Sequence, residues 1–150
     1  MAGNLVRLER SGVLPASAAS VWRVLRDFNG HAGWHPAVEA SAIEDGDPGD
    51  VVGAVRAFRL VGGGHLREQL IALSDRARSL TYCLLEAPVP LYDYVATMQV
   101  LPVTATDEAL LVWRSRFVPP VAQAAALIRM VESDIYEAGL SALASRFAAA

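Results

Sequence analysis

Residues 121–147, VAQAAALIRMVESDIYEAGLSALASRF, decide the fold because they have the pattern of one long amphipathic helix. A proline at the first helical position favours a helix start, and Pro119 and Pro120 precede this stretch. Apolar residues recur in it at 3.6-residue spacing: Ala124, Leu127, Ile128, Val131, Ile135, Leu143 and Phe147. A single amphipathic helix of this length needs the apolar face of a sheet to cover it.

The residues before this helix predict such a sheet. Segments with strand-like alternation or apolar runs are separated by short turn clusters. The expected strands are 5–14, 38–43, 51–61, 65–74, 78–86, 91–103 and 109–118. Because the last six follow one another through short turns, the sheet is expected to be antiparallel. The prolines of the loop 87–90 lack ladder donors, so this loop should stay outside the sheet.

Two short helices are expected between the first and second strands. Ser17 can cap a helix that runs to about Phe28 and turns one apolar face inward. The stretch 29–36, NGHAGWHP, has the composition of a second short helix or turn, which Pro36 interrupts or closes. The predicted order is therefore strand, two short helices, six strands and a long helix.

Composition and charge exclude several classes of protein. A chain of 150 residues suits one domain over 1–150, and a net charge of −3 argues against a nucleic-acid binder. No apolar run approaches the roughly 18 residues of a membrane span, so stable membrane insertion is not expected. Residues 1–12 carry three charges and no long apolar core, unlike a signal peptide. Cys83 is the only cysteine, and a cytoplasmic location is predicted.

Strand parity predicts which side chains face the interior, because alternate residues lie on opposite faces. The expected inward sets are Tyr92, Tyr94, Ala96, Met98 and Val100; Leu80, Tyr82 and Leu84; and Leu111, Trp113, Ser115 and Phe117. Parity is ambiguous in 65–74, where either Leu66, Glu68 and Leu70 or Arg67, Gln69 and Ile71 face inward.

The order of elements resembles the helix-grip fold of the START-like, birch-pollen-allergen-like (SRPBCC) superfamily. The resemblance rests on VWRVLRDFNGHAGWHP (21–36), GDVVGAVRAF (49–58), LREQL (66–70), PLYDY (90–94) and VWRSRFVPP (112–120). These segments look like the bacterial polyketide cyclase/dehydrase branch and, more distantly, plant abscisic-acid receptors. The resemblance implies an α+β fold in which a curved seven-stranded antiparallel sheet wraps a long C-terminal helix. It also implies an apolar ligand cavity, but one fold hosts many functions.

The resemblance to the hormone receptors favours an inward Glu68, with Arg56, Phe58 and Leu60 facing inward on the strand before it. A buried Glu68 is costly unless it is paired, and Arg56 or a tyrosine hydroxyl is the expected partner. Such a carboxylate suits a general acid or base or a ligand-orienting group. The alternatives are a structural ion pair or an exposed strand residue.

His35 occupies about the place where the receptors hold a ligand carboxylate with lysine. Histidine titrates near neutrality and suits acid–base work or anion binding. The alternative is a histidine packed at a helix end near the surface. His31 and His35 are four residues apart, but a zinc site needs three or four ligands, so no metal is expected.

The predicted function is binding of a small hydrophobic, aromatic or polyketide-like molecule. Candidate catalytic residues are Glu68, Tyr94 and His35. Candidate ligand-binding residues are Trp34, Arg56, Phe58, Leu60, Tyr82, Tyr92, Met98, Trp113, Phe117, Ile135 and Gly139. An enzyme of this kind would be a cofactor-free lyase or isomerase that promotes cyclisation, aromatisation or dehydration. The alternative is a non-catalytic carrier or sensor, gated by 61–66 and 87–94. A monomer or homodimer is expected.

Overall fold

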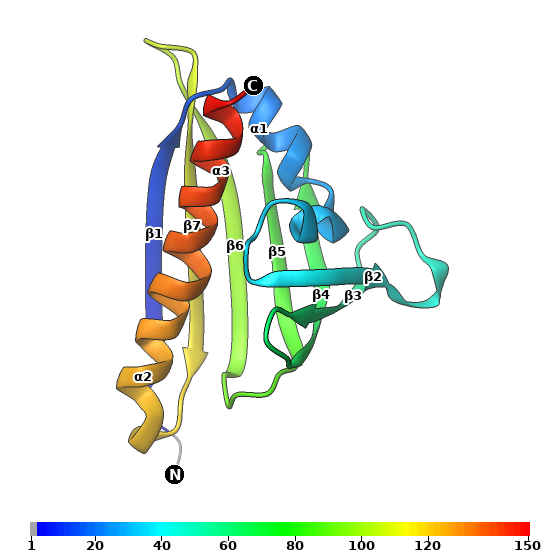
Figure 1. Ribbon diagram of the computed structural model, residues 1–150, viewed down its shortest axis with the longest axis vertical. Coiled ribbons are helices and arrows are strands. Elements are labelled where there is room, and N and C mark those ends of the chain that lie inside the picture. Colours follow the sequence, from blue (N-terminus) through cyan, green and yellow to red (C-terminus); the bar gives the residue numbers. More distant parts are fainter. Residues whose placement is uncertain (1–2) are drawn as a thin grey trace.

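The computed structural model describes residues 3–150 as one seven-stranded antiparallel sheet packed against a long C-terminal helix (Figure 1). The elements are β1 (Val6–Leu14), α1 (Ala18–Leu25), η1 (Phe28–Gly33), β2 (Val38–Ile43), η2 (Glu44–Gly46), β3 (Val55–Leu60), β4 (His65–Ser74), β5 (Ser79–Glu86), β6 (Tyr92–Val103), β7 (Glu108–Val118), η3 (Val121–Gln123), α2 (Ala124–Arg129), η4 (Met130–Glu137) and α3 (Ala138–Ala148). The strand order is β1-β7-β6-β5-β4-β3-β2. The predicted helix-grip architecture is confirmed.

The core lies between the sheet and the helices. The C-terminal helix runs along β1 and β7, and α1 lies beside the C-terminal end of this helix, against β6 and β7 (Figure 1). Ser17 caps α1 as expected, because its Oγ accepts a hydrogen bond from the Ser20 N–H at 3.2 Å. The cap turns Trp22 and Leu25 of α1 into the core, where both are buried.

The predicted strand 51–61 begins later than expected, at Val55. Val51 and Val52 are exposed and belong to a turn. Gly53 has a φ of +101°, a conformation that favours glycine and that a strand does not contain. The apolar run at 51–52 therefore belongs to the β2–β3 connection and adds nothing to the sheet.

The predicted inward face of β6 is wrong at its first residue, because Tyr92 is 54% exposed. Asp93 has a φ of +55°, and the pairing of β6 with β7 shifts register between Tyr92 and Val95. This β-bulge breaks the alternation, so that Tyr92 no longer shares a face with Tyr94. From Tyr94 onward the alternation is confirmed, with Ala96 and Met98 also buried.

The middle of the C-terminal helix, η4, is a π-helix. A π-helix closes i→i+5 hydrogen bonds, so residues five apart lie on one side. Val131 and Tyr136 have this spacing, and both are 0% exposed. The 3.6-residue pattern placed Ile135 on the buried stripe and missed Tyr136.

Candidate functional site

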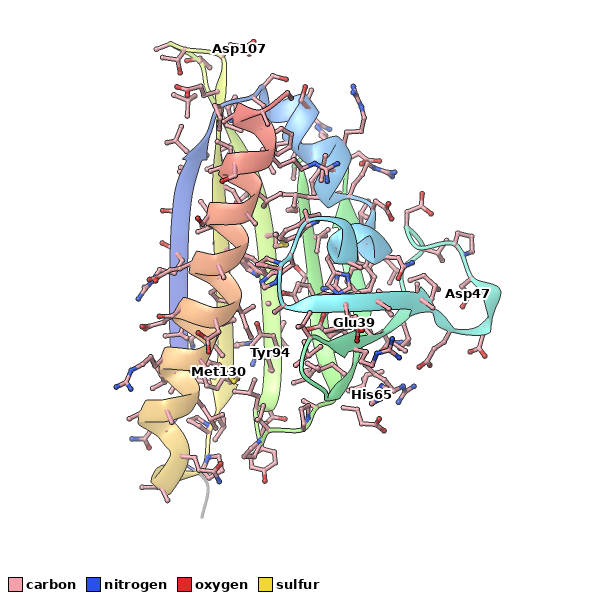
Figure 2. The ribbon with its side chains drawn as sticks, viewed as in Figure 1. Glu39, Asp47, His65, Tyr94, Asp107 and Met130 are labelled. Carbon is pink, nitrogen blue, oxygen red and sulfur yellow. The ribbon has the colours of Figure 1, made fainter. Side chains whose placement is uncertain are left out.

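A cavity of about 250 Å³ lies between the sheet and η4. Figure 2 shows Tyr94 on β6 between the long helix, which carries Met130, and the β2–β3 side of the molecule. The predicted residues that line the cavity are Trp34, His35, Arg56, Phe58, Leu60, Glu68, Tyr82, Tyr94, Met98, Trp113 and Ile135. Their roles in binding or catalysis stay predictions.

Three predicted residues do not line the cavity. Tyr92 is outside because of the bulge in β6. Phe117 is fully buried behind the wall, with its ring centroid 5.9 Å from that of Tyr94. Gly139 also lies behind the wall, where a Cβ would stand 2.8 Å from Cζ3 of Trp113. Its missing side chain allows the helix to approach Trp113 closely.

Arg56 and Glu68 form a buried ion pair in the cavity wall. The Arg56 Nε and Nη2 both donate to Glu68 Oε1, at 2.9 and 2.7 Å, and Nη1 donates to the Phe28 carbonyl. The ambiguity in β4 is thereby resolved, because Glu68 faces inward. Both bonds end on Oε1, which leaves Oε2 without a hydrogen-bond partner among residues 3–150. Burial raises the pKa of Glu68, against the opposing charge of Arg56.

The aromatic wall beside this pair contains two hydrogen-bonded phenols, and the Arg56 guanidinium lies 4.9 Å from the centroid of the Tyr82 ring. The Tyr94 hydroxyl bonds to that of Tyr136, and the Trp113 Nε1 donates to the Tyr82 hydroxyl at 3.2 Å. Trp113 also stacks on Tyr136 with a centroid distance of 4.5 Å. Burial raises the pKa of Tyr82 and of Tyr94 well above 10, so both stay protonated at neutral pH.

His35 has both ring nitrogens engaged. A carbonyl can only accept, so Nε2 carries the proton that it donates to the Ile135 carbonyl at 2.7 Å. Nδ1 then accepts from the Ala37 N–H at 3.1 Å. The bond to Ile135 ties the segment that follows η1 to η4, and no ring nitrogen of His35 is open to a ligand in this conformation. Burial also lowers the pKa of His35.

His31 lines the cavity as well, and sequence reasoning did not select it as a binding residue. The side chain is 6% exposed, and its ring packs edge-on against the ring of Phe58, with 4.6 Å between the ring centroids. Neither of its ring nitrogens has a hydrogen-bond partner among the described residues. Burial, with the nearby charge of Arg56, lowers the pKa of His31 to about 2. The only sequence signal for this residue was its four-residue spacing from His35.

The depressed pKa of His31 predicts a loss of stability in mild acid. Below about pH 6.5 the unfolded chain protonates His31, whereas the folded chain does so only near pH 2. The contribution of His31 to the free energy of unfolding is therefore largest above pH 6.5. It decreases by about 1.4 kcal/mol for each unit by which the pH is lowered below that value. Urea unfolding from pH 6 to 5 should give a shallower pH dependence for His31→Leu than for the wild type. Parallel curves would show that His31 is protonated in the folded protein.

The part of the chain that the structure describes contains no group of three or more His, Cys, Asp or Glu placed to hold a metal ion. Among the same residues, no helix is long and apolar enough to cross a bilayer.

A family model described as polyketide cyclase/dehydrase and lipid transport matches residues 6–148. No significant match was found among curated proteins. A solved protein from Thermobifida fusca is similar, at 30% identity and a TM-score of 0.85 over 95% of this chain and 93% of its own. The Bacillus cereus protein XoxI has 27% identity and a TM-score of 0.85, covering 95% and 96%. The Zhui aromatase/cyclase from Streptomyces sp. R1128 shares the fold, at 20% identity and a TM-score of 0.81, covering 97% and 94%.

Proposed function

The chain belongs to the polyketide cyclase/dehydrase and lipid transport family, and on this premise we propose that it binds a small aromatic or polyketide-like molecule in the cavity. The observation that carries the proposal is the cavity itself, which is mainly apolar and has a few polar groups in its wall. This composition is typical of small-molecule sites. A cavity of about 150 Å³ holds benzene, so about 250 Å³ suits a ligand of one or two rings.

The enzyme hypothesis assigns proton transfer to Glu68. Its free Oε2 is an acceptor in the cavity wall, and its raised pKa brings it closer to neutrality, which favours proton exchange at physiological pH. The cavity would hold a reactive chain in a folded shape, and cyclisation or dehydration would follow without a cofactor. The similar fold of an aromatase/cyclase is consistent with this chemistry.

The carrier or sensor hypothesis is favoured by the engagement of Arg56 and His35, two further ionisable groups of the cavity wall. Arg56 is neutralised by Glu68, and both nitrogens of His35 are hydrogen-bonded. The two loops expected to form a gate, 61–66 and 87–94, also lie against each other at the cavity. Their contact is close: a Cβ built on Gly64 would lie 3.3 Å from Cγ of Pro88. Pro88 lines the cavity, so movement of this contact would open or close it.

The two hypotheses predict different results for Glu68→Gln. Trp34 and Trp113 line the cavity, so tryptophan fluorescence should report binding of uncharged aromatic ketones and phenols. Mass spectrometry of the same mixtures would detect products. For an enzyme, Glu68→Gln should lower turnover by about 100-fold or more, while exposed Glu39→Gln leaves it unchanged.

A carrier would instead bind without turnover, and Glu68→Gln would change only affinity. No binding of any compound in such a series would contradict both hypotheses. Loss of turnover in both glutamine variants would contradict the role of Glu68.

A further inference from the structure

The oxygen of one tyrosine in the cavity wall, Tyr82, already accepts a hydrogen bond from the protein. An indole N–H can only donate, so Trp113 is the donor and the Tyr82 hydroxyl oxygen is the acceptor. No acceptor for the Tyr82 proton lies within hydrogen-bond distance among residues 3–150. Tyr82 lines the cavity, so a ligand is the remaining partner for this proton.

The second tyrosine, Tyr94, shares one hydrogen bond with Tyr136, in which either hydroxyl can be the donor. Tyr136 is 0% exposed and does not line the cavity, so its proton must find an acceptor within the protein. Tyr94 is the hydrogen-bond partner of the Tyr136 hydroxyl, and the Ser115 hydroxyl lies near enough to lower the pKa of Tyr136. When Tyr136 donates to Tyr94, the proton of Tyr94 is left for a ligand.

We propose that Tyr82 and Tyr94 form a donor site for a carbonyl or enolate oxygen of the ligand, and that Tyr136 is the positioning residue that turns the Tyr94 proton toward the cavity. The inference rests on the proposed binding function and narrows its ligand class. Two phenol rings with centroids 6.4 Å apart line one cavity, so a compact ketone can reach either hydroxyl. Donors fixed in place before the ligand arrives stabilise a developing oxyanion most effectively.

The charges of the wall favour an uncharged ketone over a carboxylate. Arg56 is the only cation among the cavity-lining residues that the structure describes, and Glu68 and the Phe28 carbonyl occupy three of its nitrogens. A carboxylate ligand would have no free counter-charge, and a buried unpaired charge is costly. A neutral carbonyl needs only a donor, which the two phenols supply.

The stacked pair of Trp113 and Tyr136 supports both donors at once. Trp113 holds Tyr82 through Nε1 and stacks on Tyr136 at 4.5 Å, and Tyr136 holds Tyr94. The π-helical spacing brings Tyr136 to this position on the side of Val131. Removing the Tyr136 hydroxyl should therefore affect ketone binding, although this hydroxyl does not reach the cavity.

The test uses 1-tetralone, a bicyclic ketone, and tetralin, the same skeleton without oxygen. Dissociation constants come from tryptophan fluorescence, and the infrared C=O stretch of bound tetralone reports hydrogen-bond donation. The Kd for tetralone should rise about twofold to tenfold in Tyr82→Phe, Tyr94→Phe and Tyr136→Phe, the effect of about one hydrogen bond. The C=O stretch should move toward its frequency in apolar solvent. Tetralin should bind all variants equally, and Tyr92→Phe, exposed on the same strand, should match the wild type in every measurement.

An unchanged Kd and C=O frequency in Tyr136→Phe would overturn the positioning role. An equal loss of tetralin and tetralone affinity would also overturn the inference, because it would show a packing defect. Tetralone bound to the wild type without a shifted C=O stretch would overturn the donor site alone and leave the binding cavity intact. Failure of both compounds to bind the wild type would overturn the donor site together with the proposed function.

Discussion

Arg56→Leu should destabilise the protein by about 3–5 kcal/mol at neutral pH, because Glu68 would become a buried charge without a partner. The two side chains are only 8% and 9% exposed, and two hydrogen bonds from Arg56 satisfy Glu68 Oε1. The guanidinium also lies 4.0 Å from the centroid of the Phe28 ring, and leucine would lose this contact. Urea unfolding at pH 7 measures the loss.

Arg59→Leu is a matched control on the same strand. Arg59 pairs with Glu39 at 2.7 Å, but these side chains are 49% and 52% exposed, so its loss should cost at most about 1 kcal/mol. Arg56→Leu combined with Glu68→Leu should recover most of the stability, because no unpaired charge remains. Equal effects of Arg56→Leu and Arg59→Leu would show that Glu68 is solvated in the folded protein.

The pH dependence gives a further check on the same pair. Burial raises the pKa of Glu68, and removing Arg56 takes away the charge that opposes this rise. A carboxyl group whose pKa is raised in the folded state lowers the free energy of unfolding at high pH, where the group is charged. This loss becomes smaller as the pH falls and the folded protein takes up a proton at the carboxyl group. The stability gap between Arg56→Leu and the double leucine variant should therefore narrow as the pH approaches 4.5.

The elements of the fold could be predicted because their signals are local and repeated. The strand β7 alternates from Trp113 to Phe117: the predicted inward residues Trp113, Ser115 and Phe117 are buried, and the arginines between them are exposed. The prediction for Tyr92 was wrong because Asp93, the residue after it, has a positive φ. The resulting bulge interrupts the alternation of inward and outward side chains, so that Tyr92 points to the other face of the strand. An aspartate in a strand carries too weak a signal to reveal such a bulge.

The composition of the cavity wall was more predictable than its hydrogen bonds. An inward Glu68 requires a partner, and Arg56 lay on the expected neighbouring strand, so the pair could be anticipated. The buried position of Tyr136 could not be predicted in this way, because the 3.6-residue period of an α-helix does not hold in a π-helix. The engagement of His35 depends on the Ile135 carbonyl, which is 100 residues away in sequence and carries no side-chain signal.

Gly139→Leu should destabilise the protein by about 2–3 kcal/mol, because the helix has no room for a side chain at this position. A Cβ here would lie 2.8 Å from Cζ3 of Trp113 and 3.0 Å from Cδ2 of His35. Neither ring can move away cheaply: Trp113 is bonded to Tyr82, and His35 is tied to the Ile135 carbonyl. The better helix propensity of leucine, about 1 kcal/mol, offsets only part of this overpacking.

The same substitution should also weaken ligand binding, because Trp113 lines the cavity and would be pushed into it. Gly33→Leu is the control, since a Cβ on Gly33 meets no atom within 4 Å and should change stability by less than about 0.5 kcal/mol. Thermal unfolding and tetralone titration of both variants separate the two effects. If Gly139→Leu folded as stably as the wild type but lost tetralone binding, the helix would have moved as a unit and closed the cavity. If it kept both stability and binding, the close approach of the helix to Trp113 would not be required for either.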